Sequence, residues 1–170
     1  MSSYIALLRA VNVGGTGKLP MTELKAMCES AGFTNIRSYI ASGNVLFNSA
    51  LTEAAVKQLL NDKLLAYAGK PVGVLVRSAA EMAAVLAANP FPDAPGSRVV
   101  AIFLNAAAPP DALAAAVGRQ NELMALGRRE IYVHYDDGMA DSKLRIPAAK
   151  AGTARNMNTV AKLAGMAGLS

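Results

Sequence analysis

Cysteine, histidine and tryptophan are nearly missing from this chain of 170 residues, which has one Cys, one His and no Trp. A single cysteine makes neither an internal disulfide nor a thiolate metal site, which excludes zinc fingers and disulfide-rich secreted scaffolds. Gly, Pro or a charged residue interrupts each apolar segment well before the roughly 18 residues of a membrane span, and the N-terminus lacks a signal-peptide pattern. We therefore expect a cytoplasmic protein with no membrane partner.

Charged residues are also scarce, at 17% of the chain against 53% hydrophobic residues. This balance excludes the intrinsically disordered class, whose low hydrophobicity cannot offset chain entropy. The length predicts a single compact domain over residues 1–170. Seventeen Lys and Arg against twelve Asp and Glu give a net charge of +5, which permits an anionic partner without identifying it.

The first half of the chain alternates between strand and helix patterns separated by Gly and Pro. The expected elements are a strand over 4–8, a helix from Pro20 that stops at Gly32, strands over 35–40 and 44–47, a helix capped by Thr52 that ends at Gly69, and a strand over 71–76. This β-α-β-β-α-β order is that of a ferredoxin-like unit.

The second half repeats the beginning of that order. A capping box at Ser78 and Glu81 predicts a helix, and a linker follows over 91–97. The later elements are a strand over 99–104, an Ala-rich helix from Pro109 to about Gly118, a hairpin of 122–126 with 130–135, and a closing helix that carries Met157 and Val160. The predicted fold class is therefore α+β, with duplicated ferredoxin-like halves at approximately 1–90 and 97–170 and helices packed on the sheets. The uninterrupted apolar runs of the first and fifth strands predict burial on both faces.

A glycine-rich loop over 12–18 is the first candidate binding element, with Asn12, Gly14, Gly15 and Lys18. Glycines let backbone N–H groups converge on an anion, and the helix that begins near Pro20 adds the positive end of its dipole. A P-loop is excluded because Asn12 and Leu19 stand where Gly and Ser or Thr are required. A tight strand-to-helix connection is the alternative interpretation.

Further polar residues are expected at the edges of the first sheet, namely Arg9, Ser42, Asn44 and Arg77. Arg and Asn hold carboxylates, phosphates or a nucleic-acid backbone, but they supply no proton-transfer group near neutral pH. These residues therefore indicate binding rather than catalysis.

The segment 153–159 is the second candidate, with Thr153, Arg155 and Asn156 at the expected start of the last helix. Such a density of hydrogen-bonding side chains suits a ligand site. It equally suits a helix cap with a local polar network.

No cofactor or metal is implied by the remaining residues. The acidic residues lack the spacing of a metal loop, and no G-x-S-x-G motif accompanies His134. Cys28 falls on the apolar stripe of the first helix and is interpreted as a core residue. Whether the protein is an enzyme is left undecided by the sequence.

Three segments resemble the bacterial domain-of-unknown-function family 1697: R-A-V-N-V-G-G at 9–15, S-Y-I-A-S-G-N-V-L-F at 38–47 and T-A-R-N-M-N-T-V at 153–160. The resemblance runs from end to end and includes V-R-S at 76–78. It implies an α/β fold of two ferredoxin-like halves and a function not assigned to any reaction. This chain departs from the family pattern at Ala10, where Gly is usual, and at Met157, where Trp is usual.

These observations lead to a small cytoplasmic binding protein for an anionic ligand that bears phosphate or carboxylate. Two alternatives stay open. One is sequence-tolerant nucleic-acid binding, which the net charge and the ferredoxin-like frame favour although the aromatic stacking residues are missing. The other is an enzyme that acts on a phosphorylated substrate.

Overall fold

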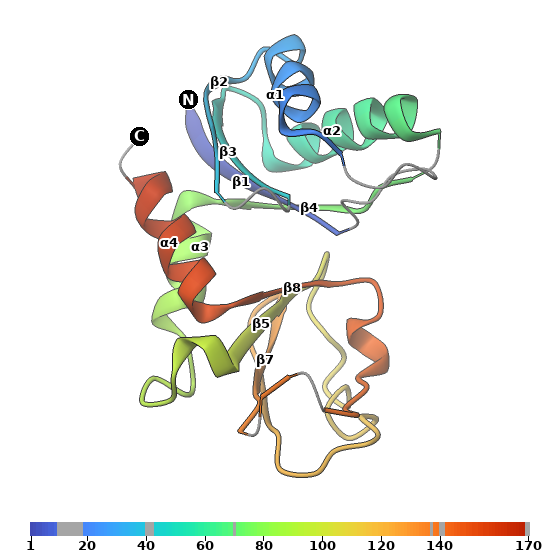
Figure 1. Ribbon diagram of the computed structural model, residues 1–170, viewed down its shortest axis with the longest axis vertical. Helices are drawn as coiled ribbons and strands as arrows, with labels where there is room; N and C mark the ends of the chain where they lie inside the picture. The colour runs from blue at the N-terminus through green and yellow to red at the C-terminus, as the bar shows by residue number, and fades with distance from the viewer. Residues whose placement is uncertain (10–18, 40–42, 70, 137, 140–141, 169–170) are drawn as a thin grey trace. The chain divides into compact units, whose positions relative to one another are not determined.

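The computed structural model describes residues 1–9, 19–39, 43–69, 71–136, 138–139 and 142–168 (Figure 1). The chain forms a mixed α+β structure of two compact units, Met1–Met82 with Leu163–Ser170 and Ala83–Lys162. The helices and strands in chain order are β1 (Ser2–Leu8), α1 (Met21–Ser30), β2 (Thr34–Ser38), β3 (Asn44–Ser49), α2 (Glu53–Ala68), β4 (Val74–Ser78), α3 (Ala79–Ala87), η2 (Gly96–Arg98), β5 (Val99–Phe103), β6 (Leu123–Leu126), β7 (Glu130–His134), η3 (Pro147–Ala149), β8 (Thr153–Asn156) and α4 (Met157–Gly168).

The first unit contains a four-stranded antiparallel sheet in the order β2-β3-β1-β4, with α1 and α2 on one face (Figure 1). Alternation along the strands sends Tyr4, Ala6 and Leu8 toward these helices. They pack there with Leu24, Cys28, Val45, Phe47, Val56, Leu60, Leu64 and Val76. Cys28 is a core residue, as expected. Burial among these apolar side chains raises the pKa of its thiol to about 12.

The helix boundaries of the first unit follow the residues that the sequence singled out. The Thr52 hydroxyl accepts a hydrogen bond from Ala55 N at 3.2 Å and caps α2. Gly69 ends this helix at φ 74°, a left-handed conformation that glycine adopts without a Cβ clash. At the start of α3, Ser78 Oγ accepts a hydrogen bond from Glu81 N at 3.2 Å, which confirms the predicted cap.

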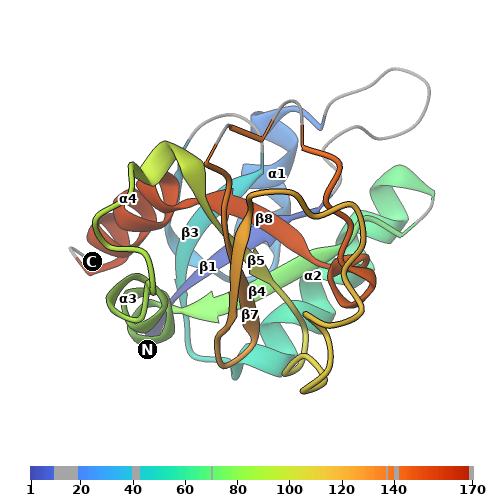
Figure 2. The same cartoon turned by 90° about the horizontal axis from the view of Figure 1, so that it is seen from below.

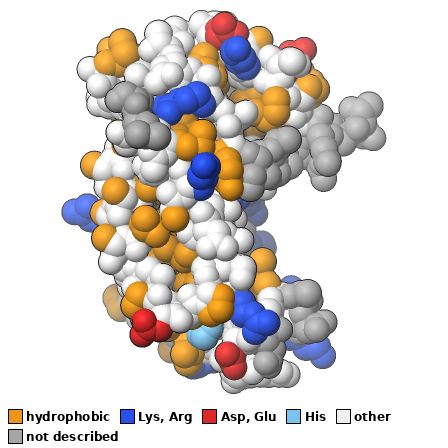
Figure 3. Space-filling model, turned by 60° about the vertical axis from the view of Figure 1, so that its left-hand side comes forward, with side chains coloured by type: hydrophobic (Ala, Val, Ile, Leu, Met, Phe, Trp, Pro, Cys, Tyr) orange, Lys and Arg blue, Asp and Glu red, His pale blue; other side chains and the backbone are white. Residues whose placement is uncertain are grey.

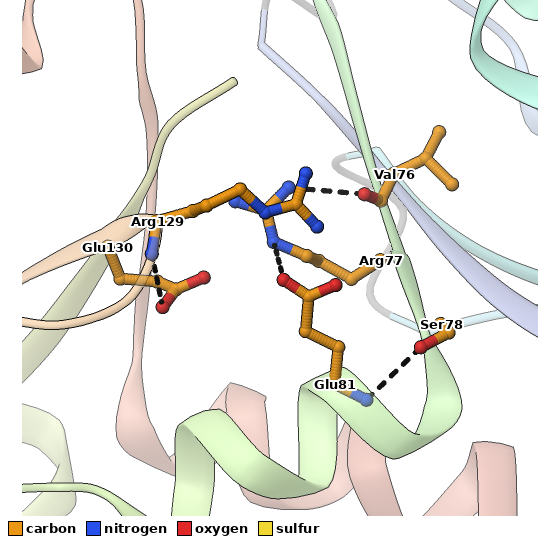
Figure 4. Close-up of polar contacts among 6 residues, drawn as sticks. All are labelled: Val76, Arg77, Ser78, Glu81, Arg129 and Glu130. Atoms are coloured by element: carbon orange, nitrogen blue, oxygen red, sulfur yellow. Dashed lines mark hydrogen bonds and ion pairs between the residues drawn. The ribbon is translucent and has the colours of Figure 1, made fainter. Parts of the chain in front are cut away.

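The opposite face of the first sheet is buried as well. Ile5 and Leu7 are 0% exposed, which confirms the expectation that β1 has two buried faces. Arg77 stands opposite Ile5 in the β1–β4 register and is 1% exposed. Figure 4 shows its guanidinium, which approaches Glu81 with 3.2 Å between Nε and Oε2 and donates from Nη1 to Val76 O at 3.1 Å.

The second unit contains a second four-stranded antiparallel sheet, in the order β6-β7-β5-β8. Figure 2 shows β7 and β8 beside β5, the strand to which both are hydrogen-bonded. Every residue of β5 is buried, so the expectation of two buried faces also holds for this strand. The predicted hairpin is present as β6 and β7.

The Ala-rich helix predicted between Pro109 and Gly118 is wrong, since residues 109–118 contain only turns and one β-bridge. Two prolines lack N–H donors, and the alanines that follow bury little apolar area to stabilise so short a helix. Single turns close instead, for example from Ala112 N to Pro109 O at 3.0 Å. The segment is then held by paired backbone hydrogen bonds of 2.8 Å between Val117 and Arg145.

Glu122 connects two loops of the second unit through hydrogen bonds. Its carboxylate accepts hydrogen bonds from Ser142 Oγ at 2.5 Å and from Gln120 N at 2.7 Å, and Arg119 Nε donates to the Glu122 backbone carbonyl at 2.7 Å. The hydrogen bond from Ser142, followed by that from Gln120, lowers the pKa of Glu122.

Glu122→Gln is therefore expected to destabilise the protein at neutral pH more than at acid pH. The unfolded carboxyl group has a pKa of about 4.3, and the folded value lies below it. The stabilisation is thus fully present above the unfolded pKa and is lost as the pH falls through the folded pKa. Urea unfolding of both proteins between pH 7 and pH 3 measures this difference, with Glu29→Gln on the exposed side of α1 as the control. A difference that grows toward acid pH would contradict the assignment.

Within the described part of the chain, no helix combines the length and the apolar character that a membrane crossing requires.

Candidate functional site

A cavity of about 510 Å³ opens in the first unit beside the edge strand β2, and we call it the β2 cavity. It combines basic, hydroxyl and apolar side chains from four elements. Its lining consists of Met21, Thr22 and Lys25 of α1, Ile36, Arg37 and Ser38 of β2, Val45 of β3 and Met166 of α4.

The start of α1 forms one wall of the β2 cavity. Pro20 precedes the helix with φ −65° and makes no side-chain cap, because its ring carries no hydrogen-bonding atom. Met21 and Thr22 thus bring the positive end of the helix dipole to the cavity, and Lys25 follows Met21 by one turn on the same face. Glu23, the acidic residue of the first turn, lines a different hollow with Ala26. This wall is therefore electropositive.

A β-bulge positions Arg37 at the cavity. Asn35 has φ 51°, a left-handed conformation that asparagine tolerates better than most residues, and the β2–β3 register shifts between Thr34 and Arg37. Such bulges bend a strand and redirect its side chains. Beyond the bulge the regular register resumes, and Ser38 stands opposite Val45.

The Arg37 guanidinium is only partly satisfied by the protein. Its Nε donates to Asn35 O at 3.2 Å and its Nη1 donates to Met166 O at 2.7 Å, near the end of α4. Its Nη2 is buried, and no atom of the described residues accepts a hydrogen bond from it. A buried donor on a charged group is costly when it has no acceptor.

Figure 3 shows Lys and Arg side chains set directly beside hydrophobic ones on one face of the molecule. The β2 cavity has the same mixture, with cations at Lys25 and Arg37 and apolar side chains at Met21 and Met166. The described lining includes no His, Asp or Glu.

Arg9, Asn44 and Arg77, the predicted site residues of the first unit that the structure describes, do not line the β2 cavity. Arg9 is exposed just after β1, and its backbone N–H donates to Gly73 O at 2.7 Å. Asn44 is buried, and its Nδ2 donates to Tyr39 O at 3.0 Å, so it closes the β2–β3 hairpin. Leu7 pairs with Asn44, which places Arg9 and Asn44 at the same end of the sheet.

Arg77 lies farther along the sheet than those two residues. Arg77 stands opposite Ile5 in the β1–β4 register. It follows Gly73, whose carbonyl accepts the hydrogen bond from the Arg9 N–H, by four residues. Four residues correspond to about 13 Å along a strand. The predicted residues Asn12, Gly14, Gly15, Lys18 and Ser42 lie outside the described residues.

The predicted residues of the second unit are adjacent in chain and space. Asn156 Oδ1 accepts a hydrogen bond from Thr159 N at 2.9 Å and caps α4, which supports the helix-cap interpretation. Arg155 stands opposite Ala101 in β8, and burial lowers the pKa of its guanidinium. Thr153 is buried, and its Oγ1 has no hydrogen-bond partner among the described residues.

Sequence reasoning missed Lys25, Arg37 and Ser38 as cavity residues. Lys25 was hidden on the polar side of an ordinary amphipathic helix, and Arg37 was one residue of a short strand. The useful signal is Asn35, because asparagine before a short β-prone run favours a bulge that redirects the next side chains.

The remaining reactive side chain that the sequence singled out, His134, is not part of the β2 cavity lining. His134 makes a tilted ring contact with Phe91, with centroids 5.6 Å apart. No group of three or more His, Cys, Asp or Glu side chains that could hold a metal ion is present in the described ranges.

Comparisons with known proteins agree with this architecture. The sequence profile of the family described as "Protein of unknown function (DUF1697)" matches residues 1–132. None of the curated proteins matches the chain. Among solved structures, the conserved bacterial protein SP0830 from Streptococcus pneumoniae is similar, with a TM-score of 0.79 and 23% sequence identity over 98% of each chain. A similarity at this identity shows the fold alone.

Proposed function

We propose that this chain, which belongs to the DUF1697 family of proteins of unknown function, is a binding protein for a small anionic ligand that bears a phosphate or carboxylate group. The β2 cavity is the site that supports this function best. The residues proposed for this site are Lys25, Arg37 and Ser38, and the class of ligand is the one expected from the sequence.

The observation that carries the proposal is the presence of two basic side chains, Lys25 and Arg37, in the lining of one cavity. Guanidinium groups bind carboxylate and phosphate oxygens through short, charge-assisted hydrogen bonds. Lys25 adds a second positive charge, and the Ser38 hydroxyl adds a neutral donor. The first turn of α1 contributes its positive dipole in the same direction.

Lys25→Gln is expected to weaken the binding of phenyl phosphate or benzoate about tenfold. Losing one charge-assisted contact of about 1.4 kcal/mol corresponds to this factor. Isothermal titration calorimetry measures the affinity. Lys63→Gln is the matched control, because Lys63 lies on α2 and lines a different hollow. Its affinity should equal that of the unmodified protein.

Absence of binding by either anion would contradict the proposal. The nucleic-acid alternative has its own signature, namely binding of a single-stranded oligonucleotide that weakens steeply with salt. Oligonucleotide binding that is insensitive to Lys25→Gln, without binding of the small anions, would favour that alternative.

We also propose that both units derive from a ferredoxin-like pattern. The first unit has the β-α-β-β-α-β element order, and its sheet order β2-β3-β1-β4 corresponds strand for strand to β6-β7-β5-β8. In the second unit, turns and the short η3 stand in the places of the two helices. The correspondence of strand order supports a duplication.

A cytoplasmic location is part of the same proposal. The single cysteine is buried and suits a compartment in which thiols stay reduced.

A further inference from the structure

We infer that the ligand of the β2 cavity is an amphiphilic anion, with one phosphate or carboxylate head and an apolar body. This inference rests on the proposed function and specifies the chemistry of its ligand. It distinguishes an alkyl or aryl phosphate or carboxylate from inorganic phosphate and from polyphosphates.

The apolar part of the lining is continuous with the core of the first unit. Val45 is 1% exposed, and both Val45 and Ile36 pack into the cluster formed by β1, α1, β3 and α2. Met21, at the start of α1, also packs against that cluster. A ligand in the cavity therefore meets a wall of fixed apolar side chains, against which hydrocarbon binds favourably.

The volume is larger than an inorganic anion needs. A cavity of about 510 Å³ lies within the range of small-molecule sites, whereas a phosphate group fills only a fraction of it. If the head group binds beside Lys25 and Arg37, most of the remaining lining is apolar, with Met21, Ile36 and Met166. Only a ligand with a hydrocarbon portion would fill this space without leaving water on apolar surface.

The positive charges in the lining of the β2 cavity indicate a ligand with one anionic head group. Among the described residues of the lining, Lys25 and Arg37 are the only cations, and they come from α1 and β2. Two positive charges match one phosphate monoester, exceed the single charge of one carboxylate and fall short of the charge on a chain of phosphates. The ligand is therefore a single-headed anion.

Two methionines give the cavity an adaptable boundary. Met21 and Met166 come from α1 and α4, and both are half-buried. The unbranched thioether side chain fits apolar groups of different shapes. Met166 also supplies, through its backbone carbonyl, the acceptor for Arg37 Nη1 at 2.7 Å. The same residue thus orients the cation and contacts the apolar body.

The test compares octyl phosphate with inorganic phosphate by calorimetry at one pH and ionic strength, below the micelle concentration of octyl phosphate. We expect octyl phosphate to bind at least tenfold more tightly. Met21→Ser should weaken octyl phosphate binding at least fivefold and leave phosphate binding unchanged. Met139→Ser is the matched control, because Met139 is 56% exposed and does not line the cavity.

The outcomes separate the two proposals. Equal affinities for octyl phosphate and inorganic phosphate would overturn this inference and leave the anion site in place. Binding of neither, together with no binding of phenyl phosphate or benzoate, would overturn the proposed function itself. Binding of octanol as tightly as octyl phosphate, unchanged by Lys25→Gln, would show apolar adsorption and also overturn the inference. Thermal unfolding of each variant establishes that it is folded, and Met166→Ser repeats the test from a second helix.

Discussion

Phe47→Ala is expected to lower the free energy of unfolding by about 4 kcal/mol, among the largest effects of any single substitution in this chain. Phe47 is 0% exposed, and its ring stacks on Phe33 with centroids 4.2 Å apart and an interplanar angle of 4°. Tyr4 approaches from β1 with its centroid at 6.1 Å. The substitution removes a ring of β3 that packs against Tyr4 of β1 and against Phe33 in the α1–β2 connection, and it leaves a cavity where the sheet meets its helices.

Urea unfolding followed by circular dichroism measures this effect. Phe47→Leu should cost less, because most of the apolar volume stays. Tyr67→Ala on the exposed side of α2 is the control, since Tyr67 is 43% exposed and little apolar area is lost there. A change near zero for Phe47→Ala would contradict the assignment of Phe47 to the core.

Glu81→Gln is expected to destabilise the protein by about 3 kcal/mol. Arg77 is 1% exposed, and its Nε lies 3.2 Å from Glu81 Oε2 (Figure 4). Removing the carboxylate takes the charge partner from a cation that cannot reach bulk water. Thermal and chemical unfolding measure the loss, and Glu29→Gln on the exposed surface of α1 serves as the control.

The double variant Arg77→Met with Glu81→Met distinguishes the contribution of the ion pair from the cost of leaving Arg77 without the Glu81 charge. Replacing both members of a buried ion pair with apolar side chains is often neutral or stabilising. We therefore expect the double variant to be more stable than Glu81→Gln alone. A double variant that is less stable than Glu81→Gln would show that the pair itself, and not the desolvated charge, determines stability at this position.

Local signals in the sequence were sufficient for most element boundaries. Thr52, Ser78 and Gly69 cap or end helices where they were expected, because capping depends on a few neighbouring atoms of the backbone. The two buried faces of β1 and β5 were equally readable, because a strand covered on both sides is apolar at consecutive positions.

Two elements show where local reasoning failed. The alanines after Pro109 have high helix propensity, yet they form turns because they bury too little to stabilise a short helix. Thr153–Asn156 is a polar segment without a strand pattern, yet it becomes β8 because the exposed edge of β5 offers it four pairing positions. In the second case, a partner distant in sequence decided the result.

The candidate site also combines features that the sequence predicts with features that depend on the fold. The sequence alone was enough to predict the order of strands and helices in the first unit, the helix caps at Thr52 and Ser78, and the burial of both faces of β1 and β5. Only the tertiary structure decided which cations share a cavity, because Lys25, Arg37 and Met166 come from α1, β2 and α4. The physical reason is that a binding site depends on distances across the fold. The bulge at Asn35 and the hydrogen bond from Arg37 to Met166 O set these distances, and both form only when the elements pack together.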